Sequence, residues 1–371
     1  MSLTMIKVVD IVYHHHSEFN KPLQVLEKHA PSLGFADFIQ QSIQFIFVKH
    51  LDYNGVEYIN GKAYAFFRGR NKFWHIPFKT HRYIKSQNPD IVLVEGLVFP
   101  LQLISLKWML GKKCRIIVQH HGEKPFEGVK GFVQKLADRN INAYLFTSYK
   151  NATAWINKKI IKNPYKCREV LEASTNFIRK DKIKSQARVG MSGVYNFLWV
   201  GRLNKNKDPL TVLKAFKKYG LYHPNARLYM IYQDEELLEE VKNKVLQSIV
   251  LEDAVKLIGK VDHCELPYWF SAANFFISGS LSEGSGYALL EAMACGCIPV
   301  VTAIPSFEKI TEKGKYGYLY PPGDVESLAL LLENLNTVPI EKERQRIEKY
   351  FREKLSFRSI AESLGDVINQ L

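Results

Sequence analysis

Residues 278–296 read Ser278-Gly-Ser-Leu-Ser-Glu283-Gly-Ser-Gly286-Tyr-Ala-Leu-Leu-Glu291-Ala-Met-Ala-Cys-Gly296 and decide the fold. The stretch follows the short apolar run Asn274–Ile277 and precedes Ile298–Val301, and both runs are typical of buried strands. Between them, Tyr287–Cys295 is typical of a helix that ends at Gly296. Strand, turn, helix and strand in this order predict a parallel sheet, with the polar turn at the carboxyl end of the first strand.

The polar turn has the chemistry of a ligand site. Crevices of open parallel sheets lie at the carboxyl ends of strands, and the N–H groups at a helix start carry a partial positive charge that favours phosphate. Gly284 and Gly286 let the backbone approach a ligand closely, and the carboxylates Glu283 and Glu291 accept hydrogen bonds from hydroxyl groups. The stretch therefore predicts a site for an anionic, hydroxyl-rich ligand.

The same alternation of strand and helix patterns continues through both halves of the chain. Further apolar runs typical of strands lie at 90–94, 115–119, 143–146, 197–200, 227–231 and 255–258. Residues 175–192 are polar and charged, and they predict a linker. We expect an α/β protein with two doubly wound, Rossmann-like domains that face each other across a cleft, at 1–185 and 192–345, followed by a helical segment at 346–371.

Length and composition agree with a folded two-domain protein. The 371 residues are many for one core, and 46% are apolar and 24% charged. The longest apolar run, Gly96–Leu110, is shorter than the roughly 20 residues that span a bilayer, and it predicts a buried helix. No secretory signal pattern opens the chain. The five cysteines are scattered and odd in number, which favours a reducing compartment, so we expect a cytoplasmic protein.

The positive charge is unevenly distributed. Residues 1–190 contain 30 Lys+Arg and 14 Asp+Glu, a net charge of +16, whereas the other 181 residues contain 21 and 23, a net charge of −2. This asymmetry predicts an anionic partner for the first half, such as a charged polymer, a lipid phosphate or a membrane surface. The alternative is a solvated face that only keeps the protein soluble.

Two cations stand where the second domain would bind an anion. Gly201-Arg202 directly follows the strand 197–200, and Lys207 precedes Asp208-Pro209, a pattern typical of a helix start. Both cations would thus lie at the carboxyl edge of one sheet and converge with the Glu283 turn on one pyrophosphate. Either one alone would be an ordinary surface cation.

Each carboxylate of the turn has two interpretations. Glu291 lies on an otherwise apolar helix, where it needs a partner; this is either a pair of ligand hydroxyls, as on a ribose, or a protein cation on a neighbouring helix. Glu283 either contacts a sugar in the cleft or caps the helix.

Histidines mark the first half. Gln119-His120-His121-Gly122 ends a strand, so we expect His121 to face the cleft and to contact a sugar hydroxyl or a developing charge. His14-His15-His16 follows a strand pattern, but adjacent side chains on an extended chain alternate in direction, which disfavours a metal site there. No Asp-x-Asp pair occurs to hold a metal-bound nucleotide. We therefore expect no metal and no other cofactor.

Together these motifs resemble the retaining glycosyltransferases of family 4, which have the GT-B fold. The segment Glu283–Gly296 is similar to the family's Glu-x7-Glu signature, and Val200–Leu203 with Lys207 is similar to its phosphate motif. Further family landmarks lie at 261–266, 317–324 and 355–360. The similarity is dense from about 197 to 327 and thinner in the first half.

The resemblance implies a role for each of these positions. Arg202 and Lys207 would bind the donor pyrophosphate, with Gly201 beside them, and Glu291 the ribose. Glu283 would bind a hydroxyl of the donor sugar. The remaining donor-binding positions are Lys260 near the base and the backbone groups of Gly286, Tyr287 and Ala288. His121 would lie beside the donor sugar, and the last helix would return to the first domain.

The implied reaction moves a sugar from a nucleotide donor, a UDP or GDP sugar, to a glycan or lipid-linked acceptor without a metal. The basic first domain would contact an anionic membrane peripherally, at the inner membrane face. Two places depart from the family: His14–Asn20 stands where many members have a Gly-Gly loop, and Tyr232–Glu235 replaces a glycine-rich turn near the base.

Two other functions remain open. A GT-B sugar-nucleotide epimerase would also hold a nucleotide, but it would need acid and base groups around the sugar ring and no acceptor. A non-enzymatic module would bind an anionic polymer with steep salt dependence. No aromatic-and-basic nucleic-acid motif occurs, so we expect no nucleic-acid partner.

Overall fold

The computed structural model describes residues 5–233 and 235–371, so Asp234, in the turn expected near the base, lies outside the described residues. The chain forms two compact units: residues up to Ser174 together with Phe357–Leu371, and Thr175–Ser356. The sequence predicted that the first domain ends at 185 and that the final helical segment begins at 346, whereas the unit boundaries lie after Ser174 and after Ser356. Within the described residues, no helix combines the length and the apolar composition required to cross a bilayer.

The first unit is built on an eight-stranded sheet in the described part of the chain, with the order β3-β4-β2-β1-β5-β6-β7-β8. All neighbouring strands are parallel except β3 and β4, which form a hairpin. The strands are β1 (Ile6–His16), β2 (Ile43–Leu51), β3 (Gly55–Ile59), β4 (Lys62–Phe67), β5 (Ile91–Glu95), β6 (Arg115–Gln119), β7 (Ala143–Phe146) and β8 (Cys167–Glu169). The helices are α1 (Pro22–Leu33), α2 (Phe78–Ser86), α3 (Pro100–Leu110), α4 (Gly128–Ala137), α5 (Tyr149–Asn157) and α15 (Phe357–Asn369), with short turns η1 (Gly34–Asp37), η2 (Asp138–Asn140) and η3 (Pro164–Lys166).

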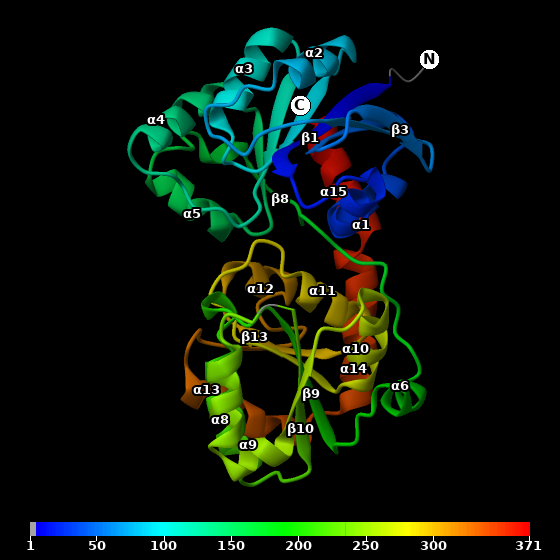
Figure 1. The fold of residues 1–371 in the computed structure, drawn as a ribbon, viewed down its shortest axis with the longest axis vertical. Coiled ribbons are helices and arrows are strands. Elements are labelled where there is room, and N and C mark those ends of the chain that lie inside the picture. Colours follow the sequence, from blue (N-terminus) through cyan, green and yellow to red (C-terminus); the bar gives the residue numbers. More distant parts are fainter. Residues whose placement is uncertain (1–4, 234) are drawn as a thin grey trace. The chain divides into compact units, whose positions relative to one another are not determined.

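Both faces of this sheet are apolar and both are covered by helices (Figure 1). Successive strand side chains point to opposite faces. Val9 and Ile11 of β1 pack in a core with α2, α3, α4 and α5, whereas Val8 packs in a second core with α1 and α15. The last helix thus completes the core of the first unit, although it follows the second unit in sequence.

The strand β1 is longer than the sequence pattern indicates. It runs through His14–His16, which we expected in a loop after the strand, and its pairing with β2 shifts register between Ile11 and His15. The strand continues because β2 extends just as far, so that His15 pairs with His50 and His16 with Leu51. The loop that replaces the family's glycines is therefore shorter than expected.

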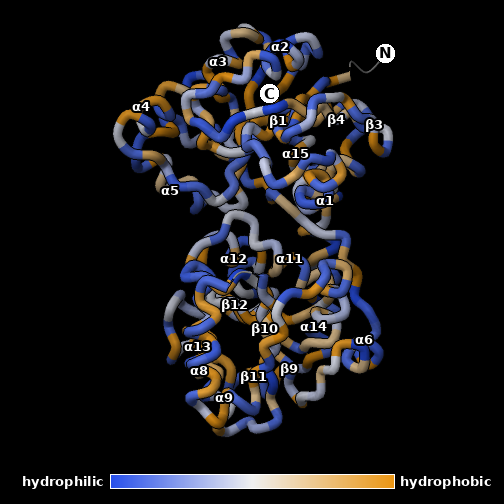
Figure 2. Tube along the Cα trace, viewed as in Figure 1, coloured by the Kyte–Doolittle hydropathy of each residue, from blue (hydrophilic) through white to orange (hydrophobic). Residues whose placement is uncertain are grey.

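The second unit has a six-stranded parallel sheet in its described residues, with the order β11-β10-β9-β12-β13-β14. Its strands are β9 (Tyr195–Gly201), β10 (Ala226–Tyr232), β11 (Val255–Gly259), β12 (Phe275–Ser278), β13 (Ile298–Thr302) and β14 (Tyr318–Tyr320). Its helices are α6 (Lys182–Val189), α7 (Pro209–Gly220), α8 (Leu238–Leu246), α9 (Ile249–Ala254), α10 (Leu266–Ala272), α11 (Tyr287–Ala294), α12 (Pro305–Ile310), α13 (Val325–Asn334) and α14 (Ile340–Tyr350), with short helical turns η4 (Lys205–Lys207), η5 (His263–Glu265), η6 (Leu335–Thr337) and η7 (Phe351–Leu355). Figure 2 shows the contrast between apolar and polar segments along this chain.

The expected linker at 175–192 was wrong in part, because it contains the helix α6. Asp181 caps this helix by accepting a hydrogen bond from the Lys184 N–H (2.8 Å), and Gly190 ends it in the left-handed conformation. The helix packs against α10 and so belongs to the second unit. Part of the basic excess of residues 1–190 therefore lies in the second unit, including Arg179 and Arg188.

Helix α14 is fixed by a buried arginine. Arg344 is fully buried and donates to the carbonyl oxygens of Ser271, Ala273 and Cys295, the Ser271 bond being 2.7 Å long. These carbonyls lie at the C-terminal ends of α10 and α11, where helices lack intrahelical donors. One guanidinium thus ties three helices together.

The strand order of each sheet has one reversal point. In both sheets, successive strands are added first on one side of the starting strand and then on the other. The change of side lies between β1 and β5 in the first unit and between β9 and β12 in the second. Crevices of open parallel sheets lie at the carboxyl ends of the strands at such a point. The expectation of two doubly wound, Rossmann-like α/β domains is confirmed.

Candidate donor and acceptor sites

Two loops meet at the reversal point of the second sheet. Gly201 ends β9 and leads into the turn η4, while Ser278 ends β12 and leads into residues 279–286. The Leu281 N–H donates to the Asn206 carbonyl oxygen (2.8 Å), and Asn206 Nδ2 donates to that of Ser282 (2.9 Å). The backbones touch so closely that a Cβ at Gly279 would lie 2.6 Å from the Asp208 carbonyl oxygen. These bonds fix the two loops as one surface.

Lys207 and Glu283 form an ion pair across these loops. Their side chains are 20% and 14% exposed, so the pair is screened from solvent yet remains open to a ligand. Lys207 is held at the mouth of α7 because the Asp208 side chain caps that helix, accepting from the Thr211 N–H (3.2 Å). The site thus offers one cation and one carboxylate that already compensate each other.

The other expected donor-site positions lie along the same carboxyl edge. Arg202 is exposed directly after β9, and Lys260 is exposed after the edge strand β11. Gly286 starts α11 with φ +64°, a left-handed conformation that favours glycine, and Tyr287 and Ala288 form the first turn of that helix. The structure places the N-terminal turn of α11 beside the Lys207–Glu283 pair.

Glu291 has a protein partner. Its Oε1 lies 2.7 Å from Nε2 of His263 in η5, and the hydrogen bond to Glu291 raises the pKa of His263 above its ordinary value. The carboxylate is only 9% exposed, whereas the imidazole is 64% exposed. This contact matches the interpretation of Glu291 as half of an ion pair, with a partner that solvent reaches. His263 was not identified from the sequence as a site residue.

The first unit has its own polar cluster at the carboxyl ends of its central strands. The ring of His121, after β6, lies between two carboxylates: Nδ1 contacts Glu172 Oε1, and Nε2 lies 2.5 Å from Glu95 Oε2 at the end of β5. An ionised carboxylate only accepts hydrogen bonds, so both ring nitrogens carry protons in this arrangement. Burial lowers the pKa of His121, but Glu172 and Glu95 raise it more, and it lies well above its ordinary value.

A second charged pair lies deeper in the same unit. Asp10 of β1 and Lys49 of β2 are both 1% exposed, and Lys49 Nζ lies 3.6 Å from Asp10 Oδ1. Burial raises the pKa of Asp10 to about 7, although Lys49 opposes this shift. Glu95 raises it further, because two carboxylates close together resist double ionisation.

The three consecutive histidines divide between surface and interior. His16 is 3% exposed, and its Nε2 lies 2.9 Å from His29 Nε2 on α1, while its Nδ1 lies 3.3 Å from Glu18. Burial lowers the pKa of His29 to about 2, so this imidazole is neutral. Within the described residues, no group of three or more histidine, cysteine or acidic side chains is arranged to hold a metal ion.

Comparison with known proteins finds similarity that is concentrated in the second unit. Residues 181–354 match the family model described as Glycosyl transferases group 1. The amylovoran biosynthesis glycosyltransferase AmsK of Erwinia amylovora is 35% identical over 203 residues, covering 50% of this chain and 48% of AmsK. Spore coat protein SA of Bacillus subtilis is 28% identical over 204 residues, covering 52% of this chain and 53% of that protein. The chain thus spans about half the length of these relatives.

Solved structures match the whole chain. HepE of Anabaena in complex with UDP superposes with a TM-score of 0.75 at 14% identity, covering 99% of this chain and 100% of HepE. Sucrose-phosphate synthase of Thermosynechococcus elongatus gives 0.71 at 16% identity, covering 99% and 98%. At these identities the likeness concerns the fold. The fold is GT-B, with two Rossmann-like units, as the sequence predicted.

Proposed function

We propose that this protein is a glycosyltransferase that moves a sugar from a nucleotide-sugar donor to a glycan or lipid-linked acceptor. The observation that carries this proposal is the fixed pair of loops at the reversal point of the second sheet, where Lys207 and Glu283 lie beside the start of α11. This surface combines a cation, a carboxylate and a helix start, which are the groups that a sugar diphosphate requires. The match of residues 181–354 to a glycosyltransferase family model supports the same conclusion.

In the proposed complex, Lys207 and Arg202 neutralise the donor diphosphate together with the first turn of α11. The phosphate oxygens give Lys207 a second anionic partner, so Glu283 is freed to accept a hydrogen bond from a hydroxyl of the donor sugar. Glu291 exchanges His263 for the ribose hydroxyls. Because Lys207, Arg202 and the helix start supply the positive charge, we propose that the reaction needs no metal.

The proposed chemistry retains the configuration of the sugar. The bond between the anomeric carbon and the leaving phosphate oxygen breaks while the acceptor oxygen bonds to the same face of that carbon. The acceptor proton passes to the leaving phosphate oxygen. Relatives whose names state a nucleotide donor or a lipid product support the donor and acceptor classes: a GDP-mannose:cellobiosyl-diphosphopolyprenol mannosyltransferase and an alpha-monoglucosyldiacylglycerol synthase. HepE, solved with UDP and with UDP-glucose, supports a UDP sugar equally.

The first test is calorimetric titration of UDP, GDP, ADP and their sugars in the presence of EDTA. We expect one nucleotide to bind and Lys207→Ala to weaken its affinity about tenfold or more, since a charge-assisted contact to phosphate is removed. Lys214→Ala is the matched control, because Lys214 is an exposed lysine of the adjoining helix α7. Equal affinities for wild type and Lys207→Ala would contradict this placement of the diphosphate.

Product analysis then separates the two enzyme classes. A transferase forms a glycosidic product only when an acceptor is present and releases the nucleoside diphosphate, whereas an epimerase changes the sugar of the donor alone. A non-enzymatic anion-binding module would bind polyanions with steep salt dependence and would be insensitive to Glu283→Gln.

A further inference from the structure

Helix α4 of the first unit presents its large apolar side chains to solvent. Val129, Phe132 and Leu136 are 69%, 61% and 37% exposed. Their spacing of three and four residues puts them on one side of the helix, as a continuous stripe. The buried side consists of Gly131, Val133, Gln134 and Ala137. Of the large apolar side chains of α4, only Val133 faces inward, whereas a surface helix usually buries most of them.

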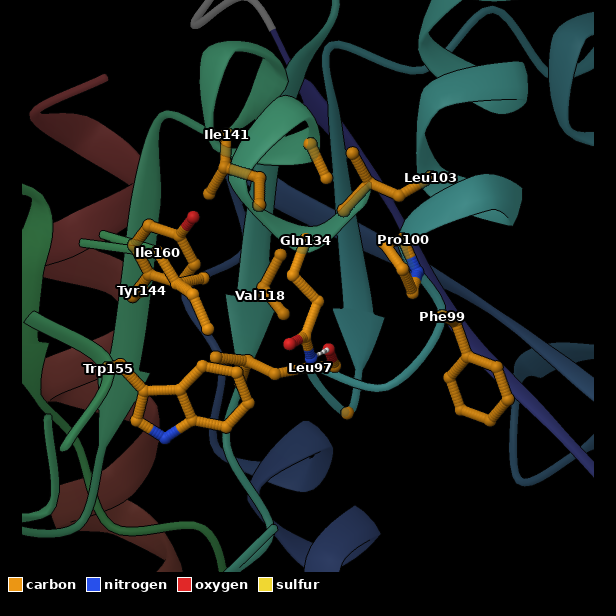
Figure 3. A pocket seen from close by; sticks show the side chains of 12 residues that line it. Leu97, Phe99, Pro100, Leu103, Val118, Gln134, Ile141, Tyr144, Trp155 and Ile160 are labelled. Atoms are coloured by element: carbon orange, nitrogen blue, oxygen red, sulfur yellow. Dashed lines mark hydrogen bonds between the residues drawn. The ribbon is translucent and has the colours of Figure 1, made fainter. Parts of the chain in front are cut away.

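The inner side of α4 is anchored without the stripe. Gln134 Nε2 donates to the Leu97 carbonyl oxygen (2.9 Å), and Gln134 Oε1 accepts from the Phe126 N–H (2.9 Å). Figure 3 shows Gln134 pointing toward Leu97, at a small cavity that Val118 and Trp155 also line. At Gly131 a Cβ would lie 2.5 Å from the Phe126 carbonyl oxygen, so the helix sits close against its own entry loop. Gln134, Gly131 and the buried Val133 thus anchor the inner side of the helix, while the three stripe residues lie outside it.

The chain segment that contains the stripe is strongly basic. Residues 124–168 contain ten lysines and arginines and two acidic residues. Of the two, Glu127 pairs with Lys158 (2.9 Å), and the buried Asp138 pairs with Lys166 (3.3 Å), so they compensate two of the ten cations. The cations of this segment are Lys124, Lys130, Lys135, Arg139, Lys150, Lys158, Lys159, Lys162, Lys166 and Arg168. The first unit as a whole contains 26 Lys+Arg and 15 Asp+Glu, a net charge of +11, and this segment alone contributes +8.

The neighbouring helix adds an aromatic side chain. Helix α3 packs against α4 and η2, and near its C-terminal end Trp108 is 84% exposed. The exposed Lys112 and Lys113 follow directly. Tryptophan has an apolar ring and a polar N–H group, so it is enriched at the interface between membrane and water. Lysines beside it can contact lipid phosphates.

We propose that the outer face of α4, with the stripe Val129, Phe132 and Leu136 and the adjacent Trp108, docks on an anionic lipid bilayer. The apolar stripe would insert at the headgroup level while the surrounding cations meet lipid phosphates. A single stripe on a helix of ten residues is small beside the roughly 800 Å² per partner of a stable protein interface, which disfavours a second copy of the chain. This docking is independent of donor binding by the second unit.

The test is sedimentation of the full chain with vesicles, at low ionic strength and without nucleotide. We expect binding to vesicles of phosphatidylglycerol and phosphatidylcholine, and little binding to phosphatidylcholine alone. Val129→Ser with Phe132→Ser should lower the affinity at least tenfold. The matched control is Leu246→Ser with Ile249→Ser, because these two residues are 65% and 87% exposed on the second unit.

The outcomes are distinguishable. Equal vesicle binding by wild type and the stripe variant would overturn the proposal. It would also be overturned if wild type did not bind vesicles but formed a concentration-dependent dimer that the stripe variant lost. Binding of soluble polyphosphate as tight as that of vesicles, and equally strong in the variant, would leave only a general attraction to anions. Unchanged melting and nucleotide affinity of the variant verify its fold, and they separate this result from a failure of the proposed transferase activity.

Discussion

His121 shows how geometry can set the charge of a single side chain. Both of its ring nitrogens face carboxylates, so the protonated ring satisfies Glu95 and Glu172 at once. Burial opposes this charge, but the two acids outweigh it, and the pKa lies well above its ordinary value. In this state His121 donates both protons to protein groups. A contact with the donor sugar, as the family resemblance implies, would require one of these bonds to break.

Replacing Glu172 with glutamine should lower the pKa of His121. One of the two acids that hold the proton is lost, while the shape of the side chain is kept. Ring-proton NMR across pH 5–10 measures this directly. The exposed Glu362→Gln serves as the control in the same unit. If His121 of the wild-type protein titrated near the ordinary histidine pKa, the two carboxylates would not hold its proton, and this prediction would be contradicted.

The same substitution predicts a pH dependence of stability. A histidine whose folded pKa is raised contributes stability that is fully present below its unfolded pKa, near 6.5, and is lost as the pH rises through the raised value. The stability difference between wild type and Glu172→Gln should therefore be greatest in acid and should shrink as the solution becomes alkaline.

The residue scale also shows what the sequence could predict. Gly122 and the preceding strand pattern marked His121, but Glu95 and Glu172 lie 26 and 51 residues away along the chain, and only the strand order brings them together. His263 was missed for the same reason, being 28 residues from Glu291. Local patterns identify a residue that stands at a strand end, whereas its partners depend on the fold.

Among the elements, α15 has the clearest structural role. Its buried residues complete the core on one face of the first sheet, together with α1. Leu364→Ala should lower the free energy of unfolding by about 2–5 kcal/mol, since a buried leucine leaves a cavity in an apolar core. Chemical denaturation followed by circular dichroism measures this loss. The exposed neighbour Glu362→Ala is the control and should change stability by less than about 0.5 kcal/mol.

Element prediction succeeded where periodicity was strong and failed where local signals were overlooked. The strands at 115–119 and 143–146 have the predicted bounds. The polar composition of α6 predicts a linker, but Asp181 and Gly190 cap a helix there. The β3–β4 hairpin also had a local signal: Asn60-Gly61 adopts positive φ at both positions, as a two-residue hairpin turn requires.

At the scale of the whole molecule, the two separate units predict a localised effect of nucleotide. A ligand that binds only the folded second unit stabilises it by about 2.7 kcal/mol at a concentration of 100 times its Kd. Hydrogen exchange measured by mass spectrometry should therefore slow in peptides of 195–302 and remain unchanged in peptides of 91–146. Slower exchange in the first unit alone would place the nucleotide there instead and would contradict the proposed donor site.

The contribution of α15 to the first unit has a consequence for biosynthesis. Residues 5–174 leave the ribosome before the second unit does, but the sheet face that packs against residues 357–369 stays uncovered until the whole second unit has been made. The second unit is continuous in sequence and can complete its own core as soon as it emerges. Residues 5–174 are thus translated before the second unit but finish folding after it, and during that interval their uncovered apolar face can bind chaperones.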